Sequence, residues 1–221
     1  MDIDPRTLAP LDRYKLLIGT IVPRPIAFVS TCDSHDRPNI APFSFFAGVG
    51  SNPMTLLFCP ANTPEGTEKD TLRNCKPASE GGLGEFVVNT VSESFMHQMA
   101  ACAEPLAFGT SEFAMAGLTP QKSAVVRPPR LAEAAITMEC RTLQVIRTNP
   151  GQPGGGNIVL GEVVHIHARD GVINDRFHVD AAALAAIGRM GGAAYCATRE
   201  RFEIPMGKAA LTIDPSQLLP R

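Results

Sequence analysis

The sequence predicts a mainly β protein, built as an antiparallel, Greek-key-like barrel with a few peripheral α-helices. Glycine and proline contribute 19 residues each to the 221. That is too many for a helical bundle, because both residues disfavour helix interiors. Short apolar stretches are separated by turn residues along the chain, as in proteins made of many short strands. Strands and helices do not alternate regularly, which argues against a parallel, doubly wound sheet.

A single domain is expected over residues 1–221, with a loose C-terminal tail that starts at Met206. Hydrophobic residues make up 44% of the chain and charged residues 19%, proportions typical of a packed globular protein. The sequence contains no linker and no internal repeat that would divide this length into independent units.

Six segments have the pattern of β-strands. A turn at 33–38 joins the first two of them, and the glycine-rich residues 150–156 are expected to join the last two in a hairpin. Pro42 lies within the second segment and lacks an amide hydrogen, so that strand is expected at a sheet edge or a bulge. The predicted strands are 26–31, 39–46, 54–59 (buried on both faces), 85–91, 135–146 and 157–167.

Three short helices are predicted around the barrel. The first begins near residues 70–71, where Asp and Thr can both act as N-caps. The second covers Ser92–Ala103 and has an apolar stripe, and the third is the alanine-rich segment 181–187. Residues 104–130 show little periodicity, and we expect a long excursion or an inserted helical turn there.

The charge balance excludes several kinds of partner. The 20 basic and 22 acidic residues give a net charge of −2, and only two Tyr and no Trp are present. We therefore expect no nucleic-acid binding. No apolar stretch is long enough to span a bilayer, and the first residues lack the apolar run of an export signal. These observations predict no membrane association and a cytoplasmic location.

The common catalytic and metal motifs are missing from the sequence. The six cysteines form no Cys-x-x-Cys pair and are expected to be reduced and mostly buried. His165 and His167 share one strand face but have no further ligand nearby, so no metal site is expected. The glycines at 151–156 lack the Gly-Lys-Ser/Thr ending of a phosphate loop, and those at 188–192 lack dinucleotide-binding spacing.

Two segments together give the strongest local signal. Residues 30–44 supply hydroxyls, an amide side chain and the backbone of a proline-distorted edge, whose free N–H and C=O groups could bond a planar polar ligand. Residues 69–71, Lys-Asp-Thr, place a cation and a hydroxyl at a helix start, which suits a phosphate. Taken alone, a Lys-Asp-Thr sequence at a helix start is more often ordinary helix capping.

Six motifs follow one another in a distinctive order along residues 14–204. They are Pro23–Thr31 (PRPIAFVST), Asn39–Phe46 (NIAPFSFF), Asn52-Pro53, Lys69-Asp70-Thr71, Gly161–Val164 (GEVV) and Arg189–Tyr195 (RMGGAAY). Together they resemble the flavin reductase-like, FMN-binding split-barrel family. The similarity is to the branch that includes flavoredoxin and the reductase components of two-component monooxygenases.

The resemblance implies a split antiparallel β-barrel that forms a homodimer and holds FMN near the subunit interface. NADH or NADPH would be the co-substrate, and a monooxygenase or an electron-transfer protein a possible partner. The resemblance names no catalytic side chain, because the cofactor carries the chemistry. The residues that it places around the cofactor are Arg24, Ser30, Thr31, Asn39, Ala41, Pro42, Ser44, Lys69, Asp70, Thr71, Arg189, Gly191, Gly192 and Tyr195.

Three functions remain open on the sequence alone. The first is an NAD(P)H:flavin reductase that passes reduced flavin or electrons to a partner. The second is an FMN-binding electron carrier that does not react with NAD(P)H, an alternative motivated by the lack of a recognisable nicotinamide fingerprint. The third is a dimeric scaffold that has lost flavin binding.

Overall fold

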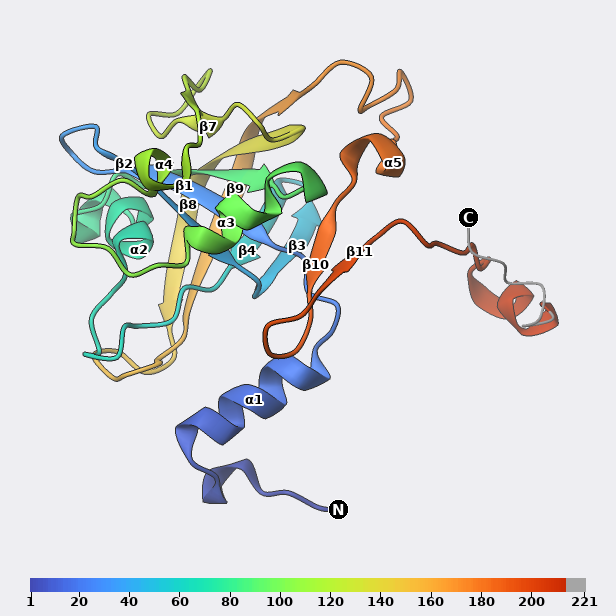
Figure 1. Cartoon of the computed structure of the whole chain (residues 1–221), viewed down its shortest axis with the longest axis horizontal. Coiled ribbons are helices and arrows are strands. Elements are labelled where there is room, and N and C mark those ends of the chain that lie inside the picture. Colours follow the sequence, from blue (N-terminus) through green and yellow to red (C-terminus); the bar gives the residue numbers. More distant parts are fainter. Residues whose placement is uncertain (214–221) are drawn as a thin grey trace.

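The computed structural model describes residues 1–213, and its main feature is a seven-stranded antiparallel sheet (Figure 1). The strand order is β2-β1-β5-β8-β9-β4-β3. Two small sheets pair β6 (Pro120–Gln121) with β7 (Arg130–Leu131) and β10 (Ile187–Arg189) with β11 (Tyr195–Ala197). The main strands are β1 (Ala27–Cys32), β2 (Pro38–Phe43), β3 (Phe46–Ser51), β4 (Met54–Phe58), β5 (Glu85–Thr90), β8 (Ile136–Arg147) and β9 (Asn157–Ala168).

The connection between β2 and β3 shows that the sheet is closed into a barrel. Only Ser44 and Phe45 separate these strands in the chain, yet the strands lie at opposite edges of the sheet. So short a link can join the two edges only if the sheet curls until they meet. No ladder joins β2 to β3 within residues 1–213, so the barrel is split at this corner. The backbone N–H of Cys59, just after β4, donates to Phe45 O at 2.9 Å and holds the corner in place.

The free edge of β2 has almost no amide hydrogens to offer. The Ile40 amide donates to Glu112 Oε2 at 3.0 Å, and therefore points away from β1. Because every second residue of an antiparallel strand points outward, Pro38 and Pro42 also lie on this side, and proline has no N–H. The edge position expected from Pro42 is confirmed. The expectation of free N–H groups on this edge was wrong, and its free backbone groups are carbonyls.

Two hydrophobic cores lie on the two faces of β1 and β2. Inside the barrel, the ring centroids of Phe43 and Phe58 are 5.3 Å apart, and those of Phe58 and Phe86 are 5.2 Å apart. Helix α2 (Asp70–Cys75) adds its buried residues to this core. Outside the barrel, Phe28 and Ile40 pack beneath α3 (Met96–Ala101) and α4 (Glu112–Ala116). Peripheral helices are therefore present as predicted, with α2 packed against the inner core and α3 and α4 covering the outer one.

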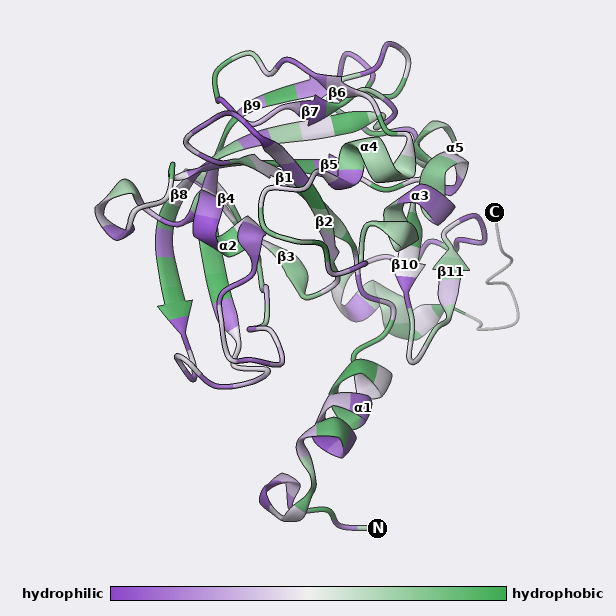
Figure 2. Ribbon diagram, turned by 60° about the vertical axis from the view of Figure 1, so that its left-hand side comes forward, coloured by the Kyte–Doolittle hydropathy of each residue, from purple (hydrophilic) through white to green (hydrophobic). Residues whose placement is uncertain are grey.

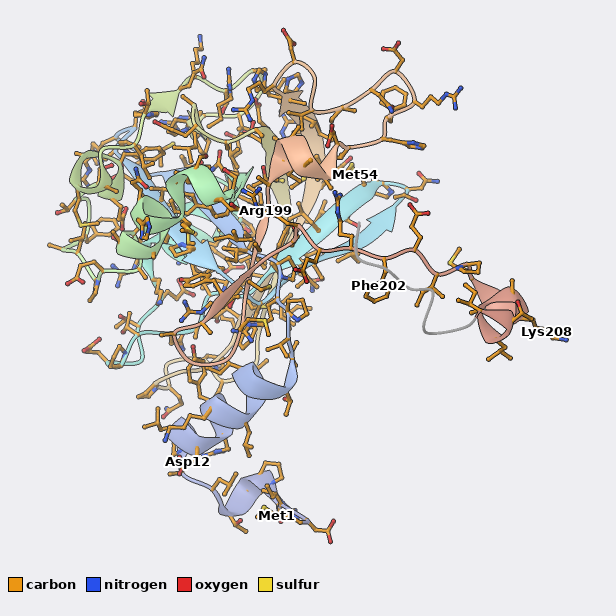
Figure 3. All side chains as sticks on the ribbon, turned by 45° about the vertical axis from the view of Figure 1, so that its right-hand side comes forward. Met1, Asp12, Met54, Arg199, Phe202 and Lys208 are labelled. Atoms are coloured by element: carbon orange, nitrogen blue, oxygen red, sulfur yellow. The ribbon has the colours of Figure 1, made fainter. Side chains whose placement is uncertain are left out.

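Two segments extend away from the barrel. Helix α1 (Pro10–Thr20), preceded by the 3-10 turn η1 (Pro5–Thr7), projects from one side with the N-terminus at its far end (Figures 1 and 2). After β11 the chain also leaves the body and ends in the 3-10 helix η4 (Gly207–Thr212). Figure 3 shows Phe202 along this C-terminal arm and Lys208 on η4, well away from the barrel. Part of the predicted loose tail, residues 214–221, lies outside the described residues.

The six predicted strands are present, but β4 is not buried on both faces as expected: Met54 is exposed, and Thr55 and Leu57 are only half-buried. Three further elements were missed. The single run expected at 39–46 bends at the corner and continues as β3, whose two glycines give it a weak strand signal. Pairing with β4 makes it a strand. Helix α1 and the β10–β11 hairpin were also not predicted. All six cysteines are free, four of them buried and two partly exposed, in agreement with the sequence.

The helix predictions need three corrections. The N-cap of α2 is Lys69, whose side chain makes no capping bond, and Asp70 is already the first helical residue. The segment expected at Ser92–Ala103 divides into the 3-10 turn η3 (Glu93–Phe95) and α3. The helix expected over 181–187 is only α5 (Ala181–Leu184), because Ala185 takes a left-handed conformation and the chain enters β10. The excursion at 104–130 contains α4, β6 and β7, and η2 (Ala78–Glu80) precedes β5.

Candidate functional site

The predicted site residues gather mainly around the two ends of β2. Asn39 lies at the start of the strand, and Ser44 follows its last residue. At about 3.3 Å per residue these two positions are about 16 Å apart. Thr31, Lys69, Asp70 and Thr71 accompany Asn39, whereas Arg24, Arg189, Gly191, Gly192 and Tyr195 lie on the side of Ser44.

At the start of β2, strand and helix side chains are hydrogen-bonded to each other. Asn39 Nδ2 donates to Thr71 Oγ1, and Asn74 Nδ2 donates to Thr31 Oγ1, both at 3.1 Å. All four residues are buried. Each threonine oxygen is an acceptor in these bonds, which leaves its hydroxyl hydrogen for another acceptor. Asn74 was missed by the sequence analysis, although its spacing of three from Thr71 places both on one face of α2.

Lys69 forms no ion pair with any residue of the described range 1–213. It is exposed at the start of α2, and desolvation by the surrounding protein lowers the pKa of its ammonium, with no charged group opposing that shift. Among the described residues, Asp70 is paired instead with Arg73, at 3.6 Å. An anion bound beside Lys69 would reverse the desolvation penalty, so this lysine is suited to a phosphate.

At the other end of β2 the barrel corner borders an apolar cavity of about 340 Å³. The end of α1, the corner itself and β4 line it with the side chains of Leu17, Ile21, Phe45, Phe46 and Leu57. Arg24 and Ser44 are the polar side chains on its wall. The apolar residues were missed because they come from segments far apart in the sequence. We call this cavity the corner pocket.

Arg24 joins the segments that surround the corner pocket. Its guanidinium donates to Ser44 Oγ at 3.1 Å, to Ile18 O and Ile21 O at the end of α1, and to Met190 O at 3.0 Å. Arg24 also lies over the ring of Phe45, and burial lowers its pKa. The residue is only 3% exposed.

The β10–β11 hairpin brings the last predicted residues to the same corner. The backbones of Arg24 and Arg189 form an antiparallel bridge. The Arg189 guanidinium stacks on the Tyr195 ring at 4.4 Å and donates to Gly192 O at 2.7 Å. Gly191 lies against the end of α1, where an added Cβ would be 3.5 Å from the Cα of Gly19.

Ser30 and Pro42 lie on the other face of the sheet. Ser30 pairs with Ile40 and Pro42 with Phe28, the pairs that contact the outer core, whereas Ala41 faces the barrel interior with Thr31 and Asn39. The Ser30 hydroxyl donates to Pro129 O at 2.5 Å and accepts from Asn89 Nδ2. The structure therefore does not bring Ser30 together with the other predicted residues.

A larger cavity of about 470 Å³ lies beyond the other end of α2, and it contains none of the predicted residues. Its basic residues are already paired with carboxylates: Arg37 with Asp33 at 2.6 Å, and Lys76 with Glu68 at 2.9 Å. A ligand would have to compete with these pairs. We therefore place the candidate site along β2 and not in this larger cavity.

Two carboxyls with raised pKa lie beside the start of β2. Burial raises the pKa of Glu112, and the charge of Asp70 raises it further. Burial also raises the pKa of Asp70, against the opposing effect of Arg73. The Glu112 carboxylate accepts the hydrogen bond from the Ile40 amide. The raised pKa makes its contribution to stability dependent on pH.

Replacing Glu112 with glutamine should therefore stabilise the protein more at high pH than at low pH. The wild-type contribution is complete below the ordinary pKa of 4.5 and is lost as the pH rises through the higher folded pKa. The Glu112→Gln side chain keeps an acceptor for Ile40 and cannot ionise. Urea unfolding should show that the free energy of unfolding of the variant, relative to that of wild type, is higher at about pH 8 than at about pH 4. If the difference in free energy of unfolding between variant and wild type is the same at both pH values, the prediction is wrong.

The donor set along β2 fits a flavin mononucleotide. The corner pocket offers apolar walls and two polar groups to a flat ring, and its volume lies within the usual range for ligand pockets. The unpaired ammonium of Lys69 and the Thr71 hydroxyl, one strand length away, suit the phosphate. The outward carbonyls of β2 lie between these ends and can accept hydrogen bonds from a polyol chain.

Comparison with known proteins points to a flavin-related family. A family model described as a flavin reductase like domain matches residues 19–183. The chain belongs to this family. The resemblance expected from the motifs is therefore confirmed.

Three similar proteins illustrate the family membership. An uncharacterized protein of Halalkalibacterium halodurans is 36% identical over 206 residues, which are 92% of this chain and 95% of that protein. The nitrilotriacetate monooxygenase component B of Bacillus cereus is 33% identical with a TM-score of 0.84, and covers 92% of this chain and 98% of its own. The 2-nitrobenzoate 2-nitroreductase of Pseudomonas fluorescens is 28% identical with a TM-score of 0.81, covering 94% and 97%.

Residues 1–213 contain neither a membrane-spanning helix nor a cluster of metal-ligating side chains. No helix there is long and apolar enough to cross a membrane. No group of three or more His, Cys, Asp or Glu side chains in that range could hold a metal ion.

Proposed function

We propose that this flavin reductase-like protein binds FMN along β2 and reduces it with NADH or NADPH. One observation carries the proposal. A lysine without an ion-pair partner lies near the start of the edge strand β2, and an apolar pocket lies at the end of the same strand. Lys69 and Thr71 would hold the phosphate, and the corner pocket would hold the ring beside Ser44. Asn39 would help to fix Thr71 through their hydrogen bond.

The protein's contribution is binding and orientation. When bound, FMN supplies the redox chemistry by accepting a hydride from the nicotinamide. The side chains around the corner pocket exclude water from one side of the ring, and Ser44 is held in place by Arg24. Arg189 and Tyr195 would close the open side of the site. None of these side chains has to act as an acid or a base for hydride transfer.

The visible spectrum of the purified protein tests this proposal. We expect added FMN to bind, which would quench its fluorescence. Anaerobic NADH or NADPH should then bleach the flavin absorbance at about 450 nm. Binding without bleaching would favour the electron carrier. If the protein neither quenches FMN fluorescence nor changes its spectrum, the flavin proposal fails and the scaffold function remains.

The electron acceptor is proposed from similarity. The match to a monooxygenase component B over nearly the whole chain supports an oxygenase as the protein partner. The cytoplasmic location stays a prediction. Oxygen consumption by a candidate oxygenase, supplied with NADH and FMN in the presence and absence of this protein, measures the coupling directly.

We also propose that the protein is a homodimer. Tyr14 and Leu17 on α1 are exposed, as is Ile21, the residue that follows the helix, at 51%. On the C-terminal arm, Phe202 and Met206 are exposed as well. Both segments extend away from the barrel (Figures 1 and 3), so these apolar side chains are not buried against it. A second copy that packs on them would bury this surface and complete the open side of the corner pocket.

Light scattering tests the homodimer. The wild-type chain should have twice the 23.6 kDa monomer mass, and the double variant Leu17→Asp/Ile21→Asp should shift it towards the monomer because buried charges destabilise an apolar interface. Val179→Asp is the matched control, since Val179 is 44% exposed on another surface. A monomeric wild-type protein, or a double variant as dimeric as the control, would contradict the proposal.

A further inference from the structure

Arg24 is a buried cation without an anionic partner. Among residues 1–213 its four hydrogen bonds go to three backbone carbonyls and one hydroxyl. The charged or ionisable groups that act on it are Tyr14 of α1 and the like-charged Arg189 of β10. Arginines removed from water are normally paired with carboxylates, so a site that keeps this charge unpaired is unusual.

Part of the cost of burying this charge is offset by backbone dipoles. Ile18 O and Ile21 O are carbonyls at the C-terminal end of α1, where the helix dipole favours a cation. These partial charges hold the guanidinium but do not neutralise it. The wall of the corner pocket therefore carries a net positive charge on an apolar surface. A ring that covers this surface would displace water from it and so strengthen its interaction with the charge.

One donor of the Arg24 guanidinium is unused. A guanidinium has five N–H groups, and four are engaged, one on Nε, two on Nη1 and one on Nη2. The second N–H of Nη2 has no acceptor among the described residues. Since Arg24 lines the corner pocket, both this donor and the charge are available to whatever occupies it.

Hydride transfer changes the charge of a flavin ring. The C4–H bond of NADH or NADPH breaks, and its electron pair and proton form the N5–H bond of the flavin. The nicotinamide leaves as NAD⁺ or NADP⁺, and the ring, neutral before, holds two more electrons and one more proton. The reduced ring therefore carries one negative charge. A fixed cation beside it stabilises the reduced state, and the transition state leading to it, more than the oxidised state.

Resting on the proposed function, we infer that Arg24 supplies the charge that makes the corner pocket bind reduced FMN more tightly than oxidised FMN. Arg24 is in this role a redox-tuning residue as well as the clamp that joins α1, Ser44 and the β10–β11 hairpin. Tighter binding of the reduced form would also keep the reduced flavin on the protein until an acceptor arrives.

The wild-type protein provides the first test. The dissociation constants of oxidised FMN and of anaerobically reduced FMN should differ by at least about tenfold in favour of the reduced form, which is about 30 mV for a two-electron couple. If FMN does not bind at all, the proposed function fails. If FMN binds and the two constants are equal, or the oxidised form binds more tightly, only the inference about Arg24 fails.

Two variants then separate charge from packing. Arg24→Met and Arg24→Lys both lose the planar set of hydrogen bonds, but only lysine keeps the charge. The preference for reduced FMN should fall at least about tenfold in Arg24→Met and stay within about threefold of wild type in Arg24→Lys. Arg141→Met, at a site 60% exposed on β8, is the control and should keep the wild-type preference.

A purely structural clamp gives a different result. Both Arg24 variants would then lower the thermal stability to a similar extent and leave the ratio of the two dissociation constants unchanged. That outcome overturns the inference. If Arg24→Met does not fold, the wild-type ratio and the Arg24→Lys ratio still decide the question, because equal binding of the two redox states by the wild-type protein contradicts it.

Discussion

Replacing Glu139 with alanine is expected to lower the free energy of unfolding by about 3–5 kcal/mol. Glu139 lies fully buried in β8. Its carboxylate accepts the backbone amides of Ala124, Val125 and Val126 at 2.7, 2.7 and 3.2 Å. The substitution leaves these three amides without their acceptors. Each amide that stays buried and unpaired costs about 1–3 kcal/mol, and relaxation of the loop recovers part of that.

Urea unfolding measures the effect as a fall in the transition midpoint at an unchanged slope. Glu133→Ala is the matched control, because Glu133 also accepts a backbone amide, that of Thr119 at 3.1 Å, but in an exposed position. Its loss should cost no more than about 1 kcal/mol. Hydrogen exchange at residues 124–126 should accelerate in Glu139→Ala alone. Equal stabilities of the two variants would show that the buried carboxylate does not hold this loop.

The barrel could be predicted from the sequence because its signals are local. Alternating or continuous apolar runs separated by turn residues predicted the strands, and Pro42 predicted the edge position of β2. Helix α1 could not be found in this way, since all its large apolar side chains except Ile18 are exposed and form no contrast with a buried face. β3 was missed for a related reason. Its glycines have weak strand propensity, and only pairing with β4 makes it a strand.

The candidate site, like the fold, could be predicted only where its signals are local in the sequence. The polar residues at the start of β2 could be predicted because they lie in two short, recognisable motifs. The corner pocket could not, because three distant segments assemble it: the end of α1, the corner at 44–47 and β4. Arg24 was expected near the cofactor, but no sequence pattern shows that its hydrogen bonds go to carbonyls instead of a carboxylate. That property depends on where the α1 end and Met190 come to lie.

Replacing Lys69 with alanine is expected to weaken FMN binding by about 1–3 kcal/mol, or roughly 5- to 150-fold in Kd. Lys69 is exposed at the start of α2, and its lowered pKa has desolvation as the cause, with no carboxylate acting on it. The substitution should therefore not leave a carboxylate without its partner. The cost should appear only when a phosphate is bound, and thermal stability without ligand should stay close to wild type.

Riboflavin, which has the same ring and no phosphate, makes this test specific. Titration calorimetry with FMN and with riboflavin should show that Lys69→Ala loses affinity for FMN only. Lys76→Ala is the matched control at the other end of α2, because its ammonium is paired with Glu68 at 2.9 Å, and it should bind both ligands like wild type. A Lys69→Ala variant that keeps its full FMN affinity, or loses riboflavin affinity equally, would place the phosphate elsewhere. A selective loss would instead tie the start of α2 to the phosphate and leave the ring to the corner pocket, where Arg24 lies.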